Sequence, residues 1–251
     1  MALAGCGPES GAWRGEAPPA PDDPAADAGY LRPPQVNSSR LASGQVVLSG
    51  LARADAEVRL GSPTGEVLNG RSDAQGAWTV RLPASQEVRL FGLSMDGGPG
   101  GRVQAQGYLA VLPDGRSAEL RSGTSAMVIA PPSDPPRLLA VDFDRDGALT
   151  VAGLAKADAG LSLRIDRTAQ GATKADHGGR FDLVIDRPVA PGRRTFEIAG
   201  ETGEQTVVVP IGAADPLDGP FRAARVGSGW RIDWITPGGG VQSTVILDPA
   251  S

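Results

Sequence analysis

The chain has 251 residues, of which 40% are hydrophobic, so it is long enough to bury sizeable cores, and at the usual domain size two domains are expected. The net charge of -5 and the lack of a Lys/Arg cluster argue against a nucleic-acid partner. The 35 glycines and 22 prolines exclude a mainly helical protein, no apolar run is long enough for a membrane-spanning helix, and the single cysteine excludes a disulfide framework.

The N-terminal sequence Leu3-Ala4-Gly5-Cys6 resembles the lipobox of bacterial lipoproteins, in which the cysteine becomes the lipidated first residue of the mature protein. The resemblance implies a lipid anchor at Cys6, with the membrane as a partner. A secretory signal needs a basic region and then about 7–15 apolar residues, so we expect the true start to lie upstream of Met1. Because Gly7 replaces the aspartate commonly read as a retention signal, the resemblance implies the outer membrane. The alternative is a flexible N-terminus with an incidental cysteine.

Residues 7–40 are rich in proline, alanine and aspartate, which break helices and offer little to bury. We therefore expect residues 1–40 to form the lipobox-like N-terminus and a disordered, extended tether. Such a tether would hold the folded part of a lipid-anchored protein away from the bilayer.

The next part of the chain contains a sequence repeat. "GLARADAEVRL", which begins at Gly50, aligns without a gap with "GLAKADAGLSL", which begins at Gly153, and the same offset later pairs Asp73, Gly76 and Trp78 with Asp176, Gly179 and Phe181. Apolar residues alternate along both copies, which is typical of half-buried strands. The two Asp-x-x-Gly segments favour hairpin loops, in which the aspartate caps the turn and the glycine takes a positive φ.

A Gly-x-Ala segment, an Ala-x-Val-x-Leu strand and an Asp-x-x-Gly-x-aromatic-x-Val turn and strand together resemble the bacterial Ig-like domains that occur in tandem on cell-envelope proteins. The resemblance implies an all-β protein of two tandem Ig-like β-sandwich domains, at residues 41–131 and 137–211. Neither copy has the cysteine pair of antibody domains, so hydrophobic packing must hold each sandwich together. The fold itself hosts many unrelated functions.

Outside the repeat, turn residues mark further strands. Pro113-Asp114-Gly115 predicts a hairpin, "APPSDPP" at residues 130–136 predicts a short stiff hinge between the domains, and residues 217–247 predict a three-stranded C-terminal β-meander. We expect this meander to pack on the second domain, because strands this short are not independently stable.

Three motifs could carry chemistry, and for each we favour a structural role. Asp142, Asp144 and Asp146 match the first half of an EF-hand calcium loop, but Gly153 stands where the loop needs a bidentate glutamate, so a solvated turn is favoured. His177 is the single histidine and lies in a predicted turn without a nucleophile motif nearby. The glycine-rich "DGGPGGR" lacks the ending of a phosphate-binding loop and predicts a flexible hairpin loop. No pattern indicates a cofactor, and we expect no enzyme.

Trp230 and Trp234 lie four residues apart and therefore on one face of a strand. Buried, they would close the second core; exposed, they would form a platform for a sugar ring or a peptide, and burial is favoured. The expected function is a non-enzymatic cell-envelope lipoprotein whose domains act as a spacer or as a binding or adhesion module for an envelope protein or polysaccharide. The alternative is a carbohydrate- or peptidoglycan-binding accessory module that uses Trp230 and Trp234.

Overall fold

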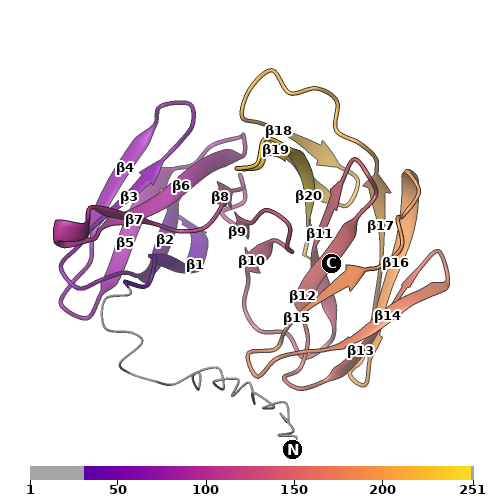
Figure 1. The fold of residues 1–251 in the computed structure, drawn as a ribbon. Helices are drawn as coiled ribbons and strands as arrows, with labels where there is room; N and C mark the ends of the chain where they lie inside the picture. Colours follow the sequence, from indigo (N-terminus) through magenta and orange to yellow (C-terminus); the bar gives the residue numbers. More distant parts are fainter. Residues whose placement is uncertain (1–30, 250–251) are drawn as a thin grey trace, which may run out of the picture. The chain divides into compact units, whose positions relative to one another are not determined.

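The computed structural model describes residues 31–249 and shows an all-β protein in which every paired strand runs antiparallel to its neighbour. The prediction of tandem β-sandwiches is therefore confirmed (Figure 1). Within residues 31–249, no helix is long and apolar enough to cross a membrane. The predictions for Cys6 and for most of the tether fall outside the described residues.

The first sandwich contains strands β1 to β10 in two sheets, with strand orders β1-β2-β5 and β10-β9-β8-β6-β3-β4; β7 pairs with β6 at the side of the second sheet. A short 3₁₀ turn at Gly98–Gly100 lies in the glycine-rich loop between β6 and β7. The strands are β1 (Gln35–Ala42), β2 (Gln45–Leu51), β3 (Glu57–Gly61), β4 (Val67–Arg71), β5 (Ala77–Pro83), β6 (Arg89–Asp96), β7 (Arg102–Gln104), β8 (Tyr108–Val111), β9 (Ser117–Leu120) and β10 (Met127–Ile129).

The second sandwich contains strands β11 to β20, with sheet orders β15-β12-β11-β20-β19-β18 and β14-β13-β16-β17. The C-terminal meander β18-β19-β20 is part of the larger sheet, because β20 pairs with β11 over residues 140–144 (Figure 1). The strands are β11 (Arg137–Asp144), β12 (Leu149–Leu154), β13 (Gly160–Ile165), β14 (Thr168–Lys174), β15 (Arg180–Ile185), β16 (Gly192–Gly200), β17 (Gly203–Ile211), β18 (Phe221–Val226), β19 (Gly229–Ile235) and β20 (Val241–Leu247).

Each sandwich has its own apolar core between its two sheets. In the first, Trp78 of β5 and Leu48 of β2 meet Phe91 of β6. In the second, Phe181 of β15 and Val141 of β11 meet Phe196 of β16. The aromatic residues of the two repeat copies, Trp78 and Phe181, therefore occupy equivalent places, as the repeat predicts.

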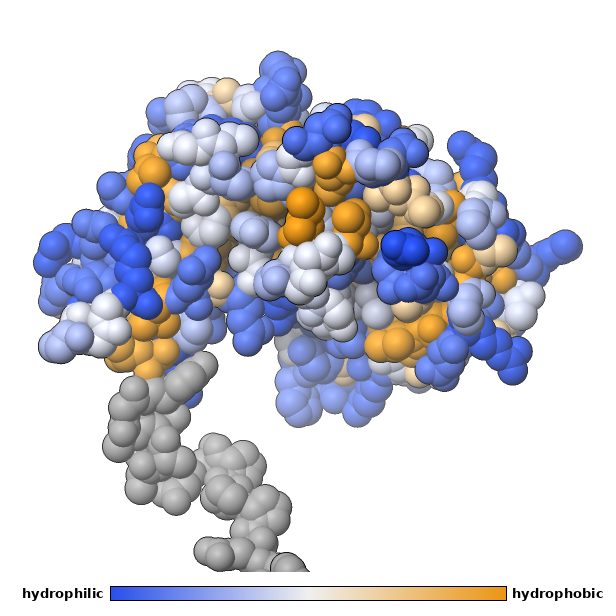
Figure 2. Space-filling view, turned by 45° about the horizontal axis from the view of Figure 1, so that its top comes forward, coloured by the Kyte–Doolittle hydropathy of each residue, from blue (hydrophilic) through white to orange (hydrophobic). Residues whose placement is uncertain are grey.

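A third core joins the two sandwiches. It contains Leu112 and Leu120 from the β8–β9 region of the first sandwich, together with Leu139, Trp234 and Ile246 from β11, β19 and β20 of the second. The strands that meet here are buried on both faces: Val245 of β20 points into the second core, whereas its neighbour Ile246 points into the third. The two sandwiches are therefore joined by packing as well as by the connecting chain. On the face shown in Figure 2, hydrophilic residues predominate and apolar residues form small separate patches.

The connection between the sandwiches, residues 130–136, runs from β10 to β11 and was expected to be a stiff hinge. The backbone carbonyl of Asp134 accepts hydrogen bonds from the backbone N–H of Lys156 (3.0 Å) and from the hydroxyl of Thr202 (2.6 Å). These bonds attach the connection to the second sandwich.

The first glycine of each repeat copy lies beneath the core aromatic. Gly50 pairs with Trp78 across β2 and β5, and Gly153 pairs with Phe181 across β12 and β15. A Cβ atom at either glycine would overlap a neighbouring backbone carbonyl and the aromatic ring. The repeat keeps glycine at this position because the ring lies directly against the backbone.

The Asp-x-x-Gly turns form with the predicted residue roles, but they do not form hairpins. In both copies an aspartate carboxylate oxygen accepts two backbone N–H groups, at 2.9 Å for Asp73 and at 2.8 Å for Asp176, and the glycine has positive φ (84° for Gly76 and 77° for Gly179). The strands that flank each turn belong to different sheets, β4 and β5 in the first copy and β14 and β15 in the second. The hairpin prediction was wrong because the turn residues alone do not indicate which sheet the next strand joins.

The first strand begins earlier than predicted. β1 starts at Gln35, inside the stretch assigned to the linker, and Val36 is buried in the first core. The sequence hides this strand because most of its residues are polar and exposed. It is held by its pairing with β2 and by a hydrogen bond between the Ser38 and Ser49 hydroxyls (2.6 Å).

Candidate functional site

The two tryptophans of β19 do not form an exposed platform. Trp234 has no exposed surface; its ring meets Tyr108 edge-on at 5.9 Å, and its Nε1 donates a hydrogen bond to the hydroxyl of Thr244 (3.3 Å). Trp230 is partly buried against the same third core, and the guanidinium of Arg225 lies 5.5 Å from its ring centre. The exposed-platform interpretation is therefore corrected for Trp234, which is enclosed in the third core, and Trp230 is covered in part by that core and by Arg225.

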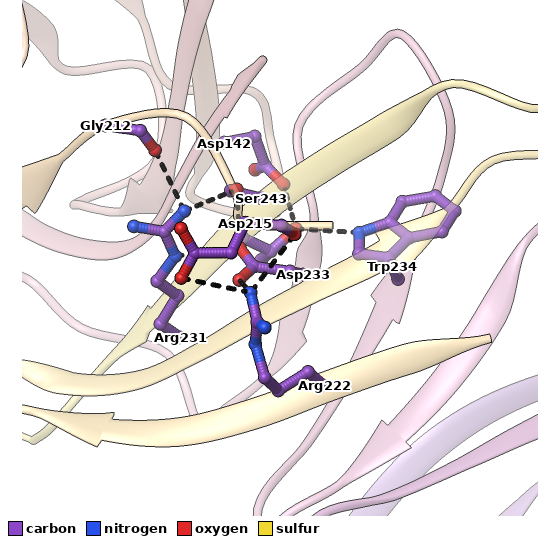
Figure 3. A network of polar contacts seen from close by, with 9 residues as sticks. Asp142, Gly212, Asp215, Arg222, Arg231, Asp233, Trp234 and Ser243 are labelled. Carbon is purple, nitrogen blue, oxygen red and sulfur yellow. Dashed lines mark hydrogen bonds and ion pairs between the residues drawn. The ribbon is translucent and has the colours of Figure 1, made fainter. Parts of the chain in front are cut away.

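A cluster of charged and polar side chains covers the sheet next to these rings (Figure 3). The carboxylate of Asp233, itself 5% exposed, accepts hydrogen bonds from Arg231 Nε (2.7 Å), the hydroxyl of Ser243 (2.6 Å) and Arg222 (3.2 Å). Arg231 also donates to the carbonyl of Gly212 (2.8 Å). Because Asp233, Arg231 and Ser243 bond one another, the cluster holds β18, β19 and β20 in place.

Asp142, a candidate calcium ligand from the sequence, is instead a buried link between the sandwiches. Its carboxylate accepts hydrogen bonds from the backbone N–H of Ala126 in the first sandwich (2.8 Å) and, in the second, from Thr244 (2.6 Å) and Gln242 (3.3 Å). Burial raises the pKa of Asp142 to about 6, because the low-dielectric interior disfavours the charged form more than these hydrogen bonds favour it.

The other two aspartates of the calcium-like motif serve the turn between β11 and β12. A carboxylate oxygen of Asp144 accepts the N–H groups of Asp146 (2.9 Å) and Ala148 (3.0 Å), and Asp146 is exposed. Asp142 points away to Ala126 and Thr244, so the three carboxylates do not converge. Within residues 31–249, no group of three or more His, Cys, Asp or Glu side chains is placed to hold a metal ion.

His177 lies in the β14–β15 turn with its side chain 95% exposed. Its Nδ1 is 3.0 Å from Asp158 Oδ2, and the same carboxylate pairs with Lys174 at 3.0 Å. The hydrogen bonds to Lys174 and His177 hold the pKa of Asp158 below its usual range. This is a surface charge cluster at a turn, as expected from the sequence.

A concave region that no sequence motif indicated is lined by residues of both sandwiches. Two hollows of about 250 Å³ and about 500 Å³ share Arg121, Met127 and Arg180 in their walls. We call this region the junction groove. The first hollow is also lined by residues of β11, β12 and β15, and the second by residues 35–37 of β1 and by Glu119 and Ile129.

The charged side chains of the junction groove come from both sandwiches. Arg121 follows β9, and Arg180 begins β15 and donates a hydrogen bond to the carbonyl of Val128 in β10 (3.1 Å). Burial raises the pKa of Glu119, and the nearby Arg121, a backbone hydrogen bond from Val36 and Arg180 partly oppose that rise. The groove thus places two guanidinium groups around a carboxyl of weakened acidity.

Sequence analysis missed this groove because its residues come from separate strands. One signal was present: the repeat copies differ directly after the Asp-x-x-Gly turn, where the first has Ala77 and the second has Arg180. A charged residue at the start of one copy's core strand indicated that this position faces something particular to the second copy.

Comparisons with known proteins show only distant likenesses. No protein-family model and no curated protein matches the chain. Among solved structures it is similar to a "Biofilm associated protein - BSP domain" (15% identity, TM-score 0.26, covering 73% of this chain and 30% of that one). It is also similar to the "Central Fibronectin-III array of RIM-binding protein" (9%, TM-score 0.25, 84% and 74%) and to a "1.5-MDa bacterial ice-binding adhesin" (11%, TM-score 0.21, 81% and 80%). The chain spans less than a third of the first of these, and at such TM-scores none supports an inference about function.

Proposed function

We propose that this chain is a non-enzymatic cell-envelope lipoprotein in which two docked β-sandwiches act as one binding or adhesion module. The observation that carries the proposal is the third core, in which Leu120 of the first sandwich packs with Trp234 and Ile246 of the second. A flexible spacer does not need such a core. A module that presents a binding surface built from both domains does, because the surface exists only while the domains keep one arrangement.

The polar contacts between the sandwiches support the same proposal. Besides the Asp142 bond to Ala126, Gln242 accepts a hydrogen bond from the backbone N–H of Gly123 (3.2 Å), and Arg116 donates to Asp248 (3.0 Å). The segment that follows β9 is therefore held against β11 and β20. This segment also supplies one wall of the junction groove, so the docking of the domains and the shape of the groove depend on the same contacts.

The lipid anchor rests on the resemblance of Leu3-Ala4-Gly5-Cys6 to a lipobox and on the proline-rich composition of the residues that follow. Two or more acyl chains anchor a protein firmly, since each buried CH₂ contributes about 0.8 kcal/mol, whereas one myristoyl chain is marginal. In this proposal, the acylated Cys6 attaches the module to the outer membrane.

The anchor is tested by expressing the gene with its native upstream region and separating membrane from soluble fractions. The wild-type protein is expected in the detergent-soluble membrane fraction, and its N-terminal peptide should carry a lipid mass on Cys6. Cys6→Ser should shift the protein to the soluble fraction or leave it unprocessed, with an unchanged circular dichroism spectrum. Ser10→Ala serves as the matched control and should stay in the membrane fraction. An unmodified Cys6 in the wild-type protein would refute the anchor.

A further inference from the structure

We propose that the junction groove binds an extended peptide that carries carboxylate side chains, held by Arg121 and Arg180 where the outer strands of three sheets meet. The inference rests on the proposed binding function and names the class of partner. It assigns recognition to the groove in place of the tryptophan strand.

The two arginines retain hydrogen-bonding capacity for a ligand. Within residues 31–249, neither Arg121 nor Arg180 forms an ion pair with a carboxylate. The Nε of Arg121 is buried and has no hydrogen-bond partner among the described residues, and Arg180 uses one nitrogen on Val128. A guanidinium has five N–H donors and pairs with a carboxylate through two parallel bonds. A ligand carboxylate would therefore pair with terminal nitrogens of the two guanidinium groups, while the buried Nε of Arg121 stays out of its reach.

The groove's other charged side chains leave these two arginines as the recognition groups. Lys174 is paired with Asp158, and one carboxylate oxygen of Asp176 is occupied by the backbone N–H groups of Gly178 and Arg180. Burial raises the pKa of Glu119, so this carboxyl balances the charge of the two arginines less strongly than an exposed carboxylate would. Asp182 is exposed in the wall of the smaller hollow, so it should repel a second carboxylate there and set the register of the peptide.

The backbone around the groove suits an extended peptide. β1, β10 and β15 are each the outermost strand of their sheet, and residues of all three line the groove. The carbonyl of Val128 in β10 points to Arg180, which shows that this side of β10 faces the groove instead of β9. Outer strands generally present N–H and C=O groups that an extended segment pairs with when it adds to a sheet. Of these strands, the Val128 carbonyl already accepts from Arg180 and the Asp182 carbonyl from Thr173 (3.0 Å), so the peptide would pair with other groups of their edges.

The chemistry of the walls favours a peptide over an acidic polysaccharide. Sugar rings are commonly bound on exposed aromatic faces, but the single aromatic residue lining the two hollows is Phe181, which is buried in the second core. Met127, which is partly exposed, instead offers an aliphatic contact for a side chain of the strand.

The test uses the full chain and an acetylated peptide of alternating valine and aspartate, with binding measured by calorimetric titration at low and at physiological salt. We expect binding that weakens with salt and that is absent for the matched valine–asparagine peptide. Arg121→Gln and Arg180→Gln should each weaken binding about tenfold, the effect of losing a charge-assisted pair worth about 1.4 kcal/mol. Arg145→Gln, which removes an exposed arginine outside the groove, should leave binding unchanged.

Because Arg180 also holds Val128, Arg180→Lys keeps the charge and controls for loss of folding; it should bind between wild type and Arg180→Gln. Equal binding of both peptides, or no effect of the arginine substitutions, would overturn the inference. Polygalacturonate binding at Arg121 in place of the peptide would also overturn it. So would tighter peptide binding after Asp22, Asp23 and Asp27 are changed to Asn, since the chain's own acidic segment would then be the occupant. Each of these results leaves the membrane-fraction test of the anchor unaffected.

Discussion

Asp142 is an acidic residue buried in the contact between the two sandwiches, and the free energy that its ionised carboxylate costs there depends on pH. The carboxyl is fully enclosed, and burial raises its pKa from 3.8 to about 6. The folded protein therefore binds this proton more readily than the unfolded chain does. From this group, the free energy of unfolding should fall as pH rises from about 4 to about 6, by on the order of 3 kcal/mol.

We predict that Asp142→Asn removes this pH dependence. The asparagine carbonyl still accepts the N–H of Ala126, and no charge needs burying, so the variant should gain stability relative to wild type as pH rises toward 7. Urea unfolding of both proteins at several pH values between 4 and 7 measures the difference. A difference that does not change with pH would show that Asp142 titrates at its ordinary pKa.

At the residue scale, the sequence predicted the roles of the repeated residues well. Asp73 and Asp176 cap their turns, and Gly76 and Gly179 take positive φ, because these are local preferences of single residue types. It did not predict that Asp142 is buried, since an aspartate in "DFDRDG" has the composition of a surface turn. Its partners lie far away in the chain, as in the bond from Thr244.

At the scale of elements, the segment from Arg121 to Ala126 connects β9 to β10 and lies against the second sandwich. Gln242 of β20 holds this segment through both polar atoms of its side-chain amide. Its Oε1 accepts a hydrogen bond from the backbone N–H of Gly123 (3.2 Å), and its Nε2 is 3.4 Å from the carbonyl of Arg121. The strands of the repeat copies were predictable from alternation, but this connection was not, because its contacts are made with a strand more than a hundred residues away.

We predict that Gln242→Ala loosens this segment without unfolding the sheets. Loss of the hydrogen bond that Gly123 donates in this partly buried site costs about 1–3 kcal/mol, which corresponds to roughly 5- to 150-fold faster exchange of the Gly123 amide. Hydrogen exchange followed by mass spectrometry should show faster exchange in the peptide that covers residues 121–126 and unchanged exchange in β13 and β16. Gln170→Ala is the matched control, because the side chain of Gln170 donates a hydrogen bond within its own strand, to the carbonyl of Thr168. Unaltered exchange at residues 121–126 would mean that Gln242 does not hold the segment.

At the scale of the whole described chain, the sequence indicated two sandwiches but not the third core. Alternation in the repeat copies predicts strands with one buried face, whereas β8 and β20 are buried on both faces. Small residues such as Ala110 and Ala118 in fact let the outer faces approach each other. The same docking brings Arg121 and Arg180 together, so the candidate groove could not be found from either repeat copy alone.

The most direct test of this account is whether the two sandwiches unfold together, and differential scanning calorimetry of the wild-type protein and of Leu120→Ala measures this. Leu120 is fully buried in the third core, and its truncation should cost about 2–5 kcal/mol. Leu41→Ala, at a residue 48% exposed, is the control and should change stability by less than about 0.5 kcal/mol. We predict one transition whose calorimetric and van't Hoff enthalpies agree, shifted as a whole to lower temperature by Leu120→Ala. Two transitions, of which Leu120→Ala shifts only one, would contradict the claim that the sandwiches form a single module.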